Sequence, residues 1–121
     1  MKINKRRISV GCLEIGKRER KGIKEVLDSG RISEGVKTCE LEKKWARFVG
    51  TKYCVATSSG TAALITALTA LKYLYKLEKR PKIITTPLTY VSVVNAIVLT
   101  GFEPVFVDID PLTFCIKPDA I

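Results

Sequence analysis

The sequence predicts an α/β fold in which a mostly parallel sheet is flanked by helices, and three observations carry that prediction. Short apolar runs at 52–57, 82–86 and 104–109 have the composition of strands. Between these runs, over about 60–75 and 90–100, apolar residues recur at helical spacing. The strand candidates are mostly apolar, as in sheets that are covered on both faces. Strands that alternate with helices in this way are typical of parallel sheets with helical crossovers.

Ahead of the first strand candidate, the sequence predicts two helices and a loop. Apolar residues at helical spacing predict a helix over 17–29, which Gly30 ends, and 30–35 is expected to be a loop. Thr38 is the expected N-cap of a second helix that ends at Gly50. Trp45 is expected to anchor this helix in a core. We therefore expect a single partial domain, with helices and loop over 1–51 and strand–helix–strand–helix–strand over 52–121.

Composition and charge exclude several classes of protein. The net charge is +9, with fifteen Lys and Arg against seven Asp and Glu before residue 53, but aromatic side chains are not interleaved with these charges. Nucleic-acid binding is therefore not expected. The sequence contains no run of about 18 apolar residues, so no membrane span is expected. With no histidine and no closely spaced cysteine pair, no metal site is expected. Cys54 and Cys115 are expected to be small core residues, and the thiols fit a cytoplasmic protein.

The residues Ser58-Ser59-Gly60-Thr61 form a turn of small residues between a strand candidate and a helix candidate. Such a turn lets backbone N–H groups approach a ligand, and the positive end of the helix dipole favours an anion such as a phosphate. Tyr90 follows the next strand candidate, so an aromatic ring is expected at the same edge of the sheet. The alternatives are that Gly60 only allows the chain to turn and that the Tyr90 ring only packs against the protein.

Four stretches, in order, carry a resemblance to a known family: 15–35, 41–53, 58–64, and 89–95 with 101–110. Over about Ile8–Ile121, the chain resembles the N-terminal third of the DegT–StrS family of pyridoxal-phosphate sugar aminotransferases. The resemblance implies part of the large domain of fold type I. It also implies transfer of an amino group from an amino acid, usually glutamate, to a keto group of a nucleotide-linked sugar, by a homodimer.

The same resemblance implies which residues contact the cofactor and the substrate. The cofactor is pyridoxal 5′-phosphate, whose phosphate would bind at Ser59, Gly60 and Thr61, while Tyr90 would stack on its ring. Substrate contacts would come from the loop that contains Gly30, Arg31, Ile32 and Ser33.

No catalytic residue is expected in this chain. In the family, the lysine that forms the Schiff base and the aspartate that protonates the pyridine nitrogen lie beyond the position of Ile121. Lys72, Lys76, Lys79 and Lys82 are interpreted as surface residues. We expect a truncated product, a fragment or a piece of a split enzyme, which alone has no transaminase activity and forms no borohydride-stable cofactor adduct at a single lysine.

Three alternatives remain open from the sequence. One is a non-catalytic remnant that binds a partner or a nucleotide sugar. A second is part of a sugar dehydratase of the same fold, in which the lysine is replaced. A third is a generic phosphate-binding α/β domain, which would leave the spacing of Tyr90 and the loop at 30–35 unexplained.

Overall fold

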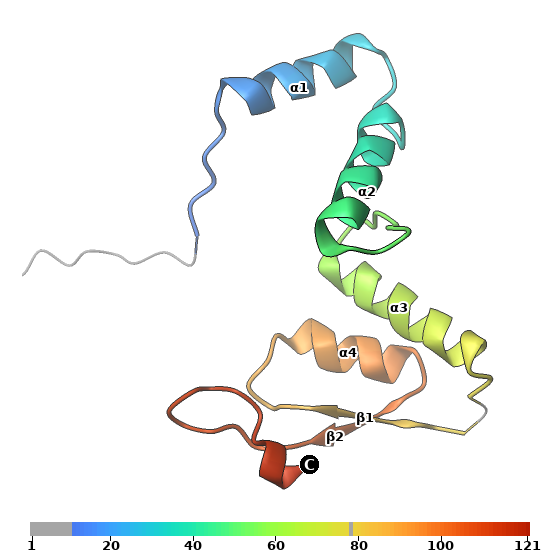
Figure 1. The fold of residues 1–121 in the computed structure, drawn as a ribbon, viewed down its shortest axis with the longest axis vertical. Helices are drawn as coiled ribbons and strands as arrows, with labels where there is room; N and C mark the ends of the chain where they lie inside the picture. The colour runs from blue at the N-terminus through green and yellow to red at the C-terminus, as the bar shows by residue number, and fades with distance from the viewer. Residues whose placement is uncertain (1–10, 78) are drawn as a thin grey trace, which may run out of the picture. The chain divides into compact units, whose positions relative to one another are not determined.

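The computed structural model describes residues 11–77 and 79–121, and it divides into two compact units. One unit ends at Cys54, and the other runs from Val55 to Ile121. Figure 1 shows the course of the chain through them. Residues 1–10 of the predicted segment 1–51 lie outside the described residues. Each unit is described by itself.

The N-terminal unit contains helices α1 (Lys17–Asp28) and α2 (Val36–Val49). At the start of α1, the Gly16 N–H donates to a carboxylate oxygen of Glu19 at 2.9 Å. The prediction of a helix that Gly30 ends is confirmed, and Gly30 has a φ of 68°. The prediction of Thr38 as the N-cap of α2 is wrong. The helix begins at Val36, directly after the extended N-cap residue Gly35, whose carbonyl accepts from the Cys39 N–H. Thr38 therefore lies inside the first turn.

Trp45 is not buried in a core, contrary to the sequence prediction. Its side chain is 51% exposed, and among the residues of α2 only Ala46 is buried. The indole instead contacts the ring of Phe48, with 5.5 Å between centroids and 40° between planes. Helical spacing places these apolar side chains on one face, but their burial requires a second element that packs on that face.

The C-terminal unit contains α3 (Gly60–Leu74), β1 (Lys82–Thr85), α4 (Val91–Leu99), β2 (Glu103–Phe106) and the short 3₁₀ helix η1 (Pro118–Ala120). Strands β1 and β2 are parallel, and Lys82 pairs with Glu103 while Thr85 pairs with Phe106. Helix α4 connects the two strands and packs against both β2 and α3 (Figure 1). The predicted α/β fold with parallel strands is confirmed for this part of the chain.

The predicted strand at 52–57 is wrong. These residues have no regular secondary structure, and the sheet of the described residues consists of β1 and β2. Strand structure requires a second backbone for ladder hydrogen bonds, and 52–57 forms no β-ladder or β-bridge with the described residues. The strand expected over 104–109 is shorter than predicted, since β2 ends at Phe106. Beyond it, Ile109 forms an isolated antiparallel bridge with Ile116.

The core of the C-terminal unit lies where α4 meets the sheet. Its buried apolar residues are Ala96, Ile97, Phe102 and Val107, and Ile97 is only 2% exposed. Cys115 is exposed and Cys54 is half-buried, so the prediction of Cys115 as a core residue is wrong. Over 11–77 and 79–121, no helix has the length and apolar content to cross a membrane. The same residues contain no group of three or more potential metal ligands.

A turn after β2 is built around Asp110, as the sequence predicts. One Asp110 carboxylate oxygen accepts from the N–H groups of Leu112 at 2.8 Å and Thr113 at 2.9 Å. The Phe114 N–H donates to the Asp110 carbonyl at 2.8 Å. The hydrogen bonds from the Thr113 and then the Leu112 backbone lower the pKa of Asp110 below its ordinary value of 3.8.

The depressed pKa predicts how this turn responds to acid. Because the folded-state pKa lies below 3.8, the stabilisation by the carboxylate is fully present above that pH and is lost as the pH falls through the folded-state pKa. We expect the Leu112 and Thr113 amide NMR shifts to titrate in this range. In Asp110→Asn they should not titrate, and titration at an ordinary pKa in the unsubstituted chain would contradict the prediction.

Candidate functional site

The turn that precedes α3 is organised by its own side chains. Ser59 is the N-cap, with extended φ and ψ of −164° and 164°, and its hydroxyl accepts from the Ala62 N–H at 3.1 Å. The Ser59 carbonyl accepts from the Ala63 N–H at 3.0 Å and from the Thr57 hydroxyl at 3.0 Å. The cap therefore satisfies the amide of Ala62, while the carbonyl starts the regular helical hydrogen bonding.

The two amides at the tip of this turn have no protein acceptor. Among the described residues, none accepts a hydrogen bond from the N–H of Gly60 or Thr61, and the Thr61 hydroxyl has no partner either. A Cβ built on Gly60 would meet no atom within 4 Å, so the approach to these groups is open. Two amides and a hydroxyl at the positive end of a 15-residue helix are a donor set that fits a phosphate.

Tyr90 occupies the equivalent position before α4. It is the N-cap residue, with φ and ψ of −67° and 133°, and its carbonyl accepts from the Val93 N–H at 2.9 Å. Its side chain is 79% exposed. In the described part of the chain, its ring stacks on no other aromatic ring. The backbone at Tyr90 is thus fixed by the helix, while the phenol is available to a ligand.

The turn before α3 and the turn before α4 lie toward the same end of the C-terminal unit. Helices α3 and α4 pack against each other. In Figure 1 both helices start at the end toward which β1 runs, and β2 ends there as well. This is the carboxyl edge of a parallel sheet, where ligands of α/β proteins bind.

The loop with Gly30, Arg31, Ile32 and Ser33 lies in the N-terminal unit. Arg31, Ile32 and Ser33, but not Gly30, line a groove of about 470 Å³ between α1 and α2. The Arg31 Nε donates to the Glu34 carbonyl at 2.9 Å. A groove of this size is large enough for a small ligand.

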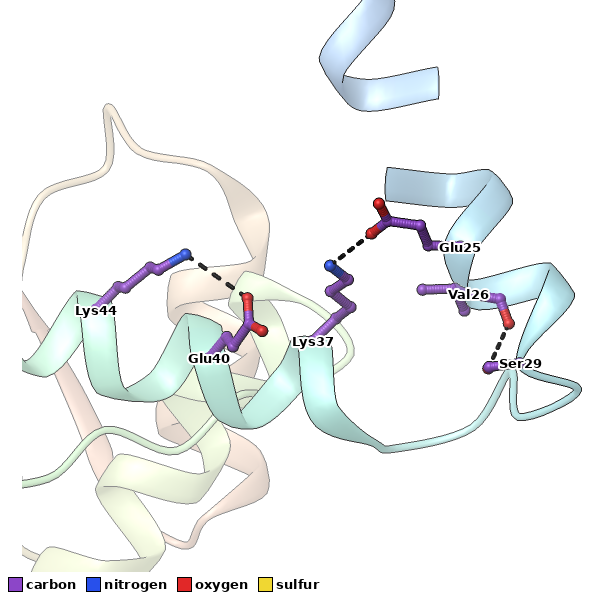
Figure 2. A network of polar contacts seen from close by, with 6 residues as sticks. All are labelled: Glu25, Val26, Ser29, Lys37, Glu40 and Lys44. Atoms are coloured by element: carbon purple, nitrogen blue, oxygen red, sulfur yellow. Dashed lines mark hydrogen bonds and ion pairs between the residues drawn. The ribbon is translucent and has the colours of Figure 1, made fainter. Parts of the chain in front are cut away.

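An ion pair joins α1 and α2, as Figure 2 shows, and both of its residues line this groove. The Lys37 ammonium lies 2.9 Å from a carboxylate oxygen of Glu25, and the Ser29 hydroxyl donates to the Val26 carbonyl at 2.6 Å. The hydrogen bond and the charge of the partner lower the pKa of Glu25 and raise the pKa of Lys37. Both groups are exposed to solvent, so their contribution to stability is small.

Sequence reasoning missed the role of Lys72. It was expected to be a surface residue, but it is half-buried, and its ammonium donates to the Thr100 carbonyl at 3.2 Å. The two residues are 28 positions apart. No local pattern signals such a contact, because it exists only once α3 and α4 are packed together.

The parallel strands β1 and β2, with α4 connecting them and α3 packed on α4, define this unit as an α/β fold. The chain belongs to the DegT/DnrJ/EryC1/StrS aminotransferase family, whose model matches residues 13–121. The predicted resemblance is therefore confirmed.

Individual relatives agree with this assignment. The chain is 45% identical over 104 residues to the spore coat polysaccharide biosynthesis protein SpsC of Bacillus subtilis, which covers 86% of the chain and 26% of SpsC. Among solved structures, an aminotransferase from Psychrobacter cryohalolentis matches with a TM-score of 0.76 and 29% identity, over 88% of this chain and 27% of that one. NtdA from Bacillus subtilis, with bound cofactor PMP, matches with a TM-score of 0.72 and 32% identity, over 84% and 22%. The chain thus spans about a quarter of the length of these relatives.

Proposed function

We propose that this chain supplies the cofactor-phosphate site of an aminotransferase that uses pyridoxal 5′-phosphate. The reaction is the transfer of an amino group from an amino acid, with glutamate as the expected donor, to a keto group of a nucleotide-linked sugar. The observation that carries the proposal is the pair of unpartnered amides of Gly60 and Thr61 in a chain of this family. The bound PMP of NtdA and the polysaccharide role in the name of SpsC support it.

Each site residue has a defined task in this proposal. The amides of Gly60 and Thr61 and the Thr61 hydroxyl donate to the phosphate, and Ser59 holds the turn in shape by capping α3. Tyr90 lies flat on the pyridine ring and fixes its plane. When bound, the cofactor supplies the electron sink for the reaction. The chain's own residues bind and orient it.

The remaining parts of the proposal concern substrate and assembly. Gly30, Arg31, Ile32 and Ser33 contact the sugar substrate, and the segments 1–51 and 52–121 act as parts of one partial domain. The active assembly is a homodimer. Its place is the cytoplasm, because the four cysteines are unpaired and thiols stay reduced there. The lysine and aspartate that the chemistry requires come from family sequence that this chain does not match.

The test is an NMR titration of the chain with pyridoxine 5′-phosphate, which has the ring and the phosphate but no aldehyde that could react with surface lysines. We expect saturable shifts at the Gly60 and Thr61 amides, and tighter binding than that of inorganic phosphate. Tyr90→Leu should remove the preference for the ring-bearing probe and leave phosphate binding unchanged. Shifts that spread over the basic surface without saturating at this turn would refute the proposal.

A further inference from the structure

The ammonium of Lys72 joins the C-terminal ends of two helices. Lys72 lies in the last turn of α3, and its Nζ donates to the carbonyl of Thr100, which is the C-cap of α4. The Thr100 hydroxyl is buried and donates to the carbonyls of Ala96 at 2.7 Å and Ile97 at 3.1 Å. The contact therefore links α3 to the C-terminal end of α4, where the Thr100 hydroxyl binds two carbonyls of the last turn.

The charge of Lys72 suits this place. Both helices carry partial negative charge at their C-terminal ends, so one cation there stabilises both. The two helices start at the same end of the unit (Figure 1), and their dipoles point the same way. The ammonium compensates the repulsion between like helix ends at one side of the pair. A bound phosphate would compensate the partial positive charges at the N-terminal ends of the same two helices.

The chain leaves room for this ammonium at Gly101. A Cβ on Gly101 would lie 2.8 Å from the Lys72 Nζ, and the residue has a φ of 81° that favours glycine. Two features of this position, its backbone conformation and its lack of a side chain, thus accommodate the contact between Lys72 and Thr100.

We propose that Lys72 is a positioning residue for the cofactor site. Its bond to Thr100 fixes how far α3 can slide along α4, and so fixes the spacing between the Gly60–Thr61 turn and Tyr90 at the opposite helix ends. A slip by one helical turn would move the phosphate turn by about 5 Å relative to Tyr90. The proposal deepens the proposed function and rests on it.

The test compares two ligands, because only one of them depends on the spacing between the Gly60–Thr61 turn and Tyr90. Inorganic phosphate reports on the Gly60–Thr61 turn alone, whereas pyridoxine 5′-phosphate reports on the turn and Tyr90 together. In Lys72→Met we expect pyridoxine 5′-phosphate to bind about 10-fold more weakly and inorganic phosphate to bind within about 2-fold of its original affinity. Lys72→Arg should keep the original ratio of the two affinities, since its guanidinium still donates to the Thr100 carbonyl.

Matched variants separate positioning from a loss of stability. Lys76→Met removes a neighbouring exposed lysine and should change neither affinity. If Lys72→Met does not fold, Lys72→Gln takes its place, because glutamine is too short to reach the Thr100 carbonyl. In Lys72→Gln, the preference for pyridoxine 5′-phosphate over inorganic phosphate must fall, whereas Lys72→Arg keeps it. Equal weakening of both probes, or an unchanged ratio in Lys72→Met and Lys72→Gln, would overturn the role of Lys72 alone. Failure of the unsubstituted chain to prefer pyridoxine 5′-phosphate would overturn the proposed function and this inference together.

Discussion

Replacing Gly60 with aspartate is expected to abolish the binding of pyridoxine 5′-phosphate while the chain stays folded. A Cβ at this position meets no atom within 4 Å, so the side chain is accommodated. Its carboxylate would face the site of the phosphate. Like charges about 5 Å apart at an effective dielectric constant of about 20 repel by about 3 kcal/mol, or roughly 100-fold in affinity. The NMR titration of the Thr61 amide measures the loss.

Gly60→Asp should increase the free energy of unfolding, although it lowers the affinity for pyridoxine 5′-phosphate. Gly60 is the first residue of α3, where a negative side chain interacts favourably with the helix dipole, by about 0.3 to 1 kcal/mol. Gly60→Asn has the same shape without the charge and should retain most of the affinity. If Gly60→Asn and Gly60→Asp lose affinity equally, steric exclusion rather than charge is responsible, and the anion site is not supported.

Replacing Ile97 with alanine is expected to cause the largest loss of stability in the chain. Ile97 is 2% exposed, and it is the largest fully buried side chain of the described residues. It lies on α4, which packs against both β2 and α3. Truncation of a buried isoleucine costs about 2 to 5 kcal/mol, which is a large share of the stability of a small domain. Urea unfolding followed by circular dichroism measures the change.

A matched control lies at the next position of the same helix. Val98 is 50% exposed, so Val98→Ala should change the free energy of unfolding by less than about 1 kcal/mol. If both variants lose the same small amount, the packing of α4 does not stabilise the unit. Because α4 also carries Tyr90 at its start, Ile97→Ala should weaken pyridoxine 5′-phosphate binding only to the extent that it unfolds the chain.

The parts of the fold that the sequence predicted correctly depend on local signals. The helices α1, α3 and α4 follow from apolar spacing, and their ends follow from residues such as Gly30 and Ser59. The turn at Asp110 follows from the capacity of its side chain to accept from the next two or three amides. In each case the hydrogen-bond partners are within a few residues of each other.

Apart from the N-cap of α2, which is Gly35 and not Thr38, the predictions that failed concern partners that are distant in the sequence. The segment 52–57 has the composition of a strand, but it does not join the β1–β2 sheet of the described residues. Trp45 remains 51% exposed and Cys115 is exposed, because the described elements do not bury them. Apolar composition indicates what a residue can bury, and only the neighbouring elements determine whether it is buried.

The sequence by itself determined the family, the parallel α/β pattern and the small-residue turn at Ser59–Thr61, because backbone preference, helix capping and motif spacing are properties of adjacent residues. Only the tertiary structure decided that the Lys72 ammonium meets the Thr100 carbonyl. Residues far apart in the chain come into contact only when the elements that carry them pack together. The gain from packing must exceed the entropy cost of closing the intervening loop, and no short stretch of sequence reveals that balance.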